Sequence, residues 1–142
     1  MKAPILYRIA SVLLLLFAAG HTLGFRQNNP QWGAEAVLGS MRSVRFDAQG
    51  FSRSYWDFFS AFGFFFSVFL LFAAILAWLL AGFPAETLKR VRSIAWALAI
   101  CFVAVTALSW RYAFTTPTVF STLITACLVA AAWLSAKTAE TR

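Results

Sequence analysis

His21 and Asp57 are of the types that perform acid–base chemistry, and they lie at the ends of two successive apolar segments on the same expected side of a membrane. His21 is the only histidine in the chain. Asp57 stands at the head of the phenylalanine-rich stretch SYWDFFSAFGFFFSVFLLF (residues 54–72), where an ionised carboxylate is costly unless it has a partner. A His–Asp pair can serve as general acid and base or as a proton-sensitive latch. The alternatives are a structural network with Arg111, or capping of the helix by Asp57.

Other polar residues are expected near the same membrane depth as this pair. The candidate polar cluster or ligand-binding site comprises His21, Thr22, Arg53, Tyr55, Asp57, Ser60, Arg111 and Tyr112. One histidine and one aspartate are too few ligands for a metal site, and a bis-histidine haem needs two histidines, so we expect no metal and no cofactor. The sequence also has no serine–histidine–acid motif, phosphate-binding loop or glycine-rich nucleotide motif.

The composition is that of a membrane protein. The 142 residues are 61% hydrophobic and 12% charged, whereas soluble domains are about a quarter charged. The net charge of +7 comes from basic residues in ones and twos between apolar runs, which is typical of orientation signals and lipid contacts and argues against nucleic-acid binding. Cys101 and Cys127 lie inside apolar runs and are expected to be packing residues.

Four segments reach the roughly 20 apolar residues that a spanning helix needs. They are residues 5–24, 55–81, 93–112 and 118–135. The sequence therefore predicts a single all-α domain over residues 1–142, a bundle of four transmembrane helices.

The positive-inside rule gives this bundle an orientation. With both termini inside, seven basic residues are cytoplasmic: Lys2, Arg8, Lys89, Arg90, Arg92, Lys137 and Arg142. Five are on the other side: Arg26, Arg42, Arg45, Arg53 and Arg111. We expect a multi-pass protein of the bacterial inner membrane with both termini in the cytoplasm.

The first segment also resembles a signal peptide, with a basic start and small residues near position 20. Its apolar run continues to Phe25, however, and Gly20 and Gly24 form a GxxxG pair suited to close helix packing. We therefore expect a retained helix.

The second segment has two opposite sides. Small residues form one stripe along it: Ser60, Gly63, Ser67, Ala74, Ala77 and Ala81. Phenylalanines form the other: Phe58, Phe62, Phe65, Phe69 and Phe72. Small residues let helices approach in a bilayer, so the small stripe, with Gly63 and Ser67, is expected to face the other helices. The aromatic stripe is expected to face lipid or to line an apolar pocket.

The connection over residues 25–54 contains a short amphipathic pattern. Its apolar positions recur at helical spacing: Ala34, Val37, Leu38, Met41 and Val44. We expect a helix on the membrane surface, anchored by Trp32, Phe46 and Phe51. A lid over the bundle is the alternative.

The stretches GHTLGF (residues 20–25) and MRSVRFDAQGFSRSYWDFFSAFGFFFS (residues 41–67) resemble an uncharacterised family of small bacterial four-helix integral membrane proteins, with its His-Thr-x-Gly and RSYWDF motifs. The resemblance implies an inner-membrane four-helix protein and no particular activity. It marks His21, Thr22, Gly24, Arg53, Tyr55 and Asp57. Sterol isomerase-like proteins share only the architecture, because their catalytic acids have no counterpart here.

Three functions remain open on the sequence. The leading hypothesis is a non-enzymatic protein that binds a lipid, another apolar ligand or a partner helix beneath a polar cluster in the outer leaflet. The second is a small enzyme acting on a lipid or quinone headgroup, with His21 and Asp57 as acid and base. The third is a subunit or assembly factor of a membrane complex. Expected partners are membrane lipids, a second copy of the chain or a membrane partner protein.

Overall fold

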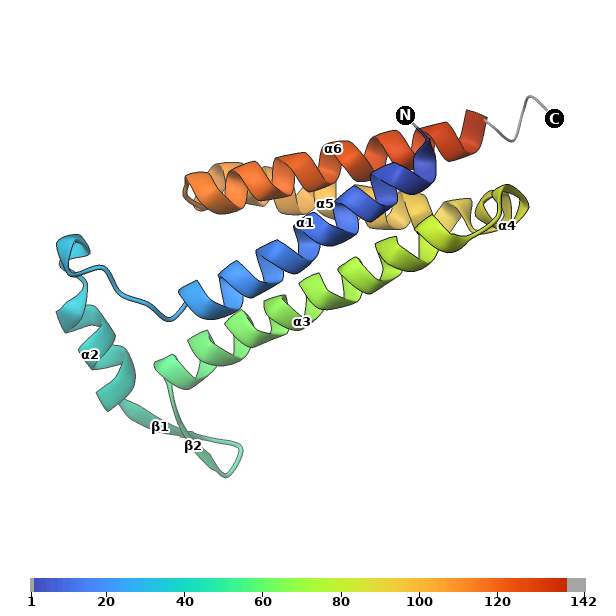
Figure 1. The fold of residues 1–142 in the computed structure, drawn as a ribbon. Helices are drawn as coiled ribbons and strands as arrows, with labels where there is room; N and C mark the ends of the chain where they lie inside the picture. Colours follow the sequence, from blue (N-terminus) through green and yellow to red (C-terminus); the bar gives the residue numbers. More distant parts are fainter. Residues whose placement is uncertain (1, 138–142) are drawn as a thin grey trace. The chain divides into compact units, whose positions relative to one another are not determined.

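The computed structural model describes residues 2–137 (Figure 1), and these residues are mostly helical. The elements in chain order are α1 (Ala3–Gly24), η1 (Pro30–Trp32), α2 (Glu35–Ser43), β1 (Arg45–Ala48), β2 (Phe51–Ser54), α3 (Tyr55–Gly82), α4 (Ala85–Arg90), α5 (Arg92–Tyr112) and α6 (Thr115–Lys137). Arg142, which contributed to the predicted orientation, lies outside the described residues.

Four of these helices are long and apolar enough to cross a membrane: α1, α3, α5 and α6. The prediction of four such helices is confirmed, and the observed ends lie within three residues of the predicted ones. The largest difference is at α6, which begins at Thr115 and so includes Pro117 in its first turn. Proline is tolerated there because its missing N–H would have no partner within the helix.

The chain forms two compact units. One consists of Met1–Phe17 and Leu70–Arg142, and we call it the bundle unit. The other, Ala18–Phe69, is called the hairpin unit. The helices α1 and α3 each contribute to both units.

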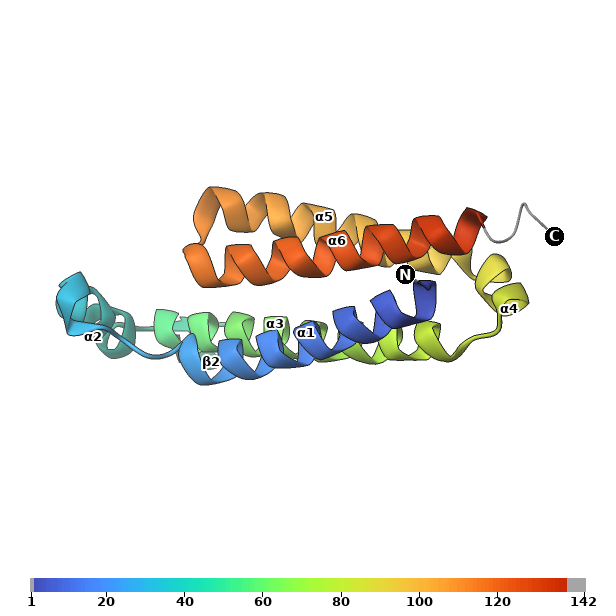
Figure 2. The same ribbon diagram turned by 45° about the horizontal axis from the view of Figure 1, so that its top comes forward.

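In the bundle unit, α5 and α6 run antiparallel and side by side (Figures 1 and 2). Hydroxyl groups join them. The Oγ1 atoms of Thr106 and Thr125 are 2.8 Å apart, and Thr125 also donates to the Phe102 carbonyl at 2.8 Å. Between α1 and α3 of the same unit, Ser11 donates to the Ala74 carbonyl at 2.8 Å. Each hydroxyl thereby satisfies a polar atom that would be costly to leave unpaired in an apolar medium.

The two sides of α3 are as predicted. Phe62 and Phe65 are 68% and 67% exposed. Small side chains on the opposite side are buried: Ser67, Ala74, Ala77 and Ala81. The small-residue stripe is therefore the packed side of α3, and Phe62 and Phe65 of the aromatic stripe are mostly exposed.

The hairpin unit contains the predicted short helix, α2, and a β-hairpin that the sequence analysis missed. Strand β1 pairs antiparallel with β2, and Arg45 lies opposite Ser54. The turn residues Gln49 and Gly50 have φ angles of 51° and 84°. Two successive residues with positive φ fit a tight hairpin turn whose twist matches the flanking strands. The surface location expected for α2 stays a prediction.

Aromatic and basic side chains attach α2 and the hairpin to the start of α3. The Arg42 guanidinium lies 4.3 Å from the centre of the Trp56 ring. Phe46 of β1 stacks on Phe58, with ring centres 5.8 Å apart. These contacts fix the chain that leads into α3.

Candidate functional site

The single histidine is held by the backbone of α3. Its Nε2 atom lies 3.1 Å from the carbonyl oxygen of Gly63. A carbonyl oxygen only accepts hydrogen bonds, so Nε2 must carry a proton. The other ring nitrogen, Nδ1, makes no hydrogen bond to residues that the structure describes. In the neutral ring Nδ1 is an acceptor.

A short chain of hydroxyl groups supports the same carbonyl. Thr22 Oγ1 lies 2.7 Å from the Ala18 carbonyl and 2.8 Å from Ser67 Oγ. Ser67 Oγ in turn donates to the Gly63 carbonyl at 3.2 Å. The Gly63 oxygen therefore accepts from both His21 and Ser67. These bonds join the end of α1 to α3 and fix the rotation of the imidazole ring.

Phenylalanine rings surround the imidazole. The Phe25 ring stacks on it at a centre-to-centre distance of 5.1 Å and an interplanar angle of 14°. The Phe66 ring meets it edge-on, at 4.9 Å and 84°. A Cβ atom at Gly63 would overlap the Phe25 ring, so the close packing requires glycine at this position. We call His21, Thr22, Gly63 and Ser67, with Phe25 and Phe66, the His21 cluster.

Asp57 does not belong to this cluster. Its Oδ2 atom accepts a hydrogen bond from the Ser54 backbone N–H at 2.8 Å, and the Ser54 hydroxyl accepts one from the Asp57 N–H at 3.3 Å. This reciprocal pair is a capping box at the start of α3. Gly63, which holds His21, is six residues further along, about 9 Å at the rise of an α-helix. The structure thus assigns Asp57 the capping role, and the expected His21–Asp57 pair is not formed.

Three other residues of the candidate polar cluster lie in the hairpin unit but do not contact His21. Arg53 donates to the Ser52 carbonyl at 3.0 Å, and its guanidinium lies over the Phe51 ring. Tyr55 is 61% exposed and packs against Phe46. The Ser60 hydroxyl is buried and has no hydrogen-bond partner among the described residues.

The remaining two members, Arg111 and Tyr112, belong to the bundle unit. Both are exposed, and the Arg111 guanidinium lies 5.2 Å from the centre of the Tyr112 ring. The proposed network of Arg111 with His21 stays a prediction.

The two glycines of the GxxxG pair face open space. A Cβ at Gly20 or Gly24 would meet no described atom within 4 Å. The sequence predicts close packing at Gly20 and Gly24. The structure has it instead at Gly63, a member of the predicted small-residue stripe. Ser67 was expected to pack between helices, and it does so through its hydrogen bond to Thr22.

Sequence reasoning missed the aromatic walls of the His21 cluster and the capping partner of Asp57. Phe25 could have been found, because it follows His21 by four residues and side chains at this spacing are neighbours on a helix. Phe66 falls outside the phenylalanine stripe, and nothing in its spacing marks it as a neighbour of His21. Ser54 could have been found, because serine three residues before an acid at a helix start is the pattern of a capping box.

The cluster is suited to binding rather than to metal chemistry. Among residues 2–137, no group of three histidine, cysteine, aspartate or glutamate side chains lies close enough to hold a metal ion. Nδ1 of His21 is a ring acceptor without a described partner, and the imidazole that carries it packs against two phenylalanine rings. A group that donates one hydrogen bond and has apolar surroundings fits this arrangement.

Comparison with known proteins found no matching family model, no matching curated protein and no matching solved structure.

Proposed function

We propose that this chain is an integral protein of the bacterial inner membrane, with both termini in the cytoplasm, that binds a lipid or another apolar molecule at the His21 cluster. The observation that carries the proposal is the His21 ring, which packs against Phe25 and Phe66 while its Nδ1 atom makes no hydrogen bond to the described residues. The hydrogen bond of Nε2 to Gly63 leaves Nδ1 as the acceptor for a hydroxyl, amide or ammonium group of the ligand.

The surroundings of the cluster support an apolar ligand. Phe59 and Phe64 are 41% and 42% exposed, and their ring centres lie 5.9 and 5.2 Å from that of Phe25. Contiguous exposed aromatic surface of this kind is typical of sites that bind lipid or ligand. The acyl or isoprenoid part of a ligand would lie along these rings, with its polar group at His21.

The position of Asp57 supports a binding protein over an enzyme. Acid–base catalysis by His21 and Asp57 would require both side chains within hydrogen-bond reach of one substrate. The Asp57 carboxylate is occupied by the Ser54 backbone, and its loss would weaken the start of α3. The geometry therefore gives the lipid or quinone enzyme less support than the binding protein, because no hydrogen bond joins Asp57 to His21.

The test is to purify the tag-free protein in nanodiscs cut from the host membrane and to identify bound molecules by native mass spectrometry. We compare His21→Phe, which keeps a flat ring but removes both nitrogens, with Trp110→Phe as a control at an exposed aromatic residue of the bundle unit. We expect the wild type and Trp110→Phe to retain the same apolar molecule and His21→Phe to lose it. Equal retention by His21→Phe, or a bound protein in place of a small molecule, would contradict the proposal.

A further inference from the structure

Arg8 is a charged residue inside a helix that is apolar enough to cross a membrane. It is the only arginine, lysine, aspartate or glutamate in α1. Tyr7 beside it is buried, whereas Arg8 is exposed, as are Ile5 and Val12. Residues three and four apart are neighbours on a helix, so Arg8 lies on an apolar outer surface. A charge at such a place in a membrane is costly unless it has a partner.

Helix α3 provides an aromatic ring for Arg8. The guanidinium carbon lies 5.2 Å from the centre of the Trp78 ring, and this ring is 53% exposed. In the bundle unit, α1 and α3 run antiparallel (Figure 1) and are joined by the hydrogen bond from Ser11 to the Ala74 carbonyl. Arg8 precedes Ser11 by about as many residues as Trp78 follows Ala74, so the pair lies at one level. Attraction between the cation and the ring face holds the guanidinium in place.

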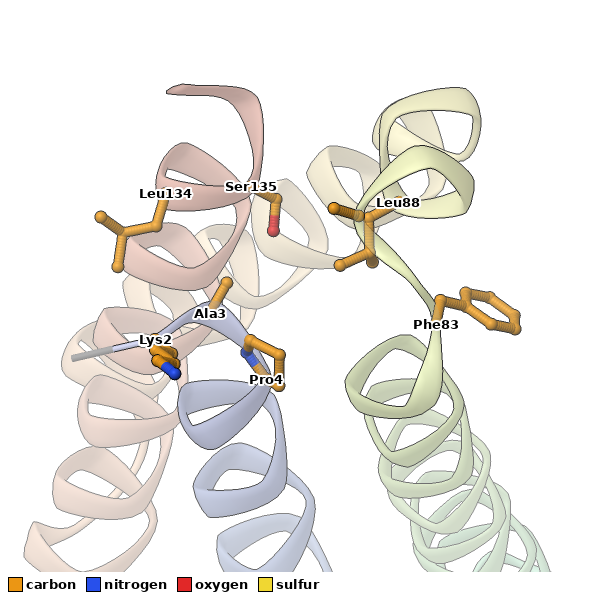
Figure 3. Close-up of a pocket in the computed structure, with 8 residues that line it drawn as sticks. Lys2, Ala3, Pro4, Phe83, Leu88, Leu134 and Ser135 are labelled. Carbon is orange, nitrogen blue, oxygen red and sulfur yellow. The ribbon is translucent and has the colours of Figure 1, made fainter. Parts of the chain in front are cut away.

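The pair lies near one end of its two helices. The first residues of α1 and the residue after α3, Phe83, line one pocket (Figure 3). Arg8 and Trp78 are each about 6–8 Å from these helix ends, at the rise of an α-helix. An arginine near a helix end extends toward the membrane interface, and a helical side chain leans toward the N-terminus. In a membrane of ordinary thickness, the guanidinium therefore reaches the level of the lipid phosphates.

The guanidinium of Arg8 has no acceptor within the described chain. No described carboxylate forms an ion pair with it, and no described oxygen accepts a hydrogen bond from it. Glu86 is the only acidic residue among the described residues of the bundle unit. A guanidinium has five N–H donors and can bind two phosphate oxygens at once. A phospholipid is a molecule that brings such an anion to an apolar protein surface.

We infer that Arg8 and Trp78 form a binding site for the phosphate group of a phospholipid. The phosphate accepts hydrogen bonds from the guanidinium, and the Trp78 ring keeps the guanidinium in position. The acyl chains run from there toward the membrane centre along the exposed residues Val12 and Ile75. The inference rests on the membrane location proposed above, and it uses no residue of the His21 cluster.

The experiment measures stabilisation of the full chain by lipid in an uncharged maltoside detergent, which contains no phosphate. Thermal unfolding is followed by circular dichroism while dioleoylphosphatidylglycerol, dioleoylglycerol or inorganic phosphate is added. Dioleoylglycerol has the same acyl chains without the phosphate headgroup. We expect saturable stabilisation of wild type by dioleoylphosphatidylglycerol and little effect of the other two. Each variant is compared with its own lipid-free form, so a change in the stability of the chain does not alter the readout.

Five variants test the two residues of the site. Arg8→Gln should bind dioleoylphosphatidylglycerol about ten-fold more weakly, as expected for loss of charge-assisted hydrogen bonds. Arg8→Lys should fall between it and wild type, because an ammonium group does not match two phosphate oxygens as a guanidinium does. Trp78→Phe keeps a ring beneath the guanidinium and should bind more tightly than Trp78→Leu. The control Arg90→Gln removes the same charge from an exposed position of α4 and should bind like wild type.

The inference is overturned if Arg8→Gln binds like wild type, if Arg90→Gln weakens binding as much, or if dioleoylglycerol or phosphate alone stabilises the chain equally. Weaker binding by His21→Phe with normal binding by Arg8→Gln would also overturn it, because the phospholipid would then act at the His21 cluster. A partner protein that copurifies with wild type and not with Arg8→Gln would put a protein in the place of the lipid and overturn it as well. The ligand of the His21 cluster should stay bound in Arg8→Gln, so either proposal can fail alone.

Discussion

Substitution of Gly63 by alanine tests the packing of the His21 cluster. A Cβ at this position would lie 2.7 Å from Cζ of Phe25 and closer still to two other ring atoms, whereas a Cβ at Gly20 would meet no described atom within 4 Å. Alanine is favoured over glycine within a helix by about 0.5–1 kcal/mol, and overpacking costs about 1–3 kcal/mol. We expect Gly63→Ala to lower the free energy of unfolding by about 1 kcal/mol, and Gly20→Ala to raise it by about 0.5 kcal/mol.

The assay is unfolding by SDS in mixed micelles, followed by tryptophan fluorescence, with the two glycine variants measured beside wild type. Gly63→Ala should also change the environment of His21, because the displaced Phe25 ring stacks on the imidazole. If Gly63→Ala stabilises the chain as much as Gly20→Ala does, then Phe25 does not pack on α3 and the cluster as described is wrong.

Two further predictions concern the start of α3 and the topology. Asp57→Ala should lower the free energy of unfolding by about 0.5–2 kcal/mol through loss of the cap, while Asp57→Asn, which keeps an acceptor oxygen for the Ser54 N–H, should cost less. An equal loss in the two variants would mean that charge, not the cap, is what matters. Reporter fusions after Arg142 and near Gln49 should give opposite compartments, as expected from the distribution of basic residues. A C-terminus outside the cytoplasm would contradict the orientation.

The long helices and the two sides of α3 could be predicted from the sequence because each depends on local composition and period. A run of apolar residues fixes a spanning length, and steps of three and four place Phe62 and Phe65 on one side of a helix. The β-hairpin was missed although its features are local. Gln49 and Gly50 form the turn between two short alternating segments. Only the amphipathic pattern before these segments was assigned to a regular element.

The partner of His21 could not be predicted in the same way. Sequence placed His21 and Asp57 near one end of adjacent helices, but it did not specify how the helices align. The hydrogen bond of His21 to Gly63 depends on that alignment, and the acceptor is a backbone atom that carries no sequence signature. Asp57 has a closer partner, Ser54, three residues before it. The capping-box pattern at the helix start could have predicted this pairing from the sequence.

The most direct test of the central claim uses the fact that the chain has one histidine. Nitrogen NMR of the tag-free protein labelled with ¹⁵N-histidine reports both ring nitrogens of His21 without ambiguity. We predict a proton on Nε2, which donates to the Gly63 carbonyl, and a change in the Nδ1 resonance, with Nε2 still protonated, when the polar lipid extract of the host membrane is added. A ring protonated on Nδ1 alone, or an Nδ1 resonance that the extract leaves unchanged, would contradict a ligand site at the His21 cluster.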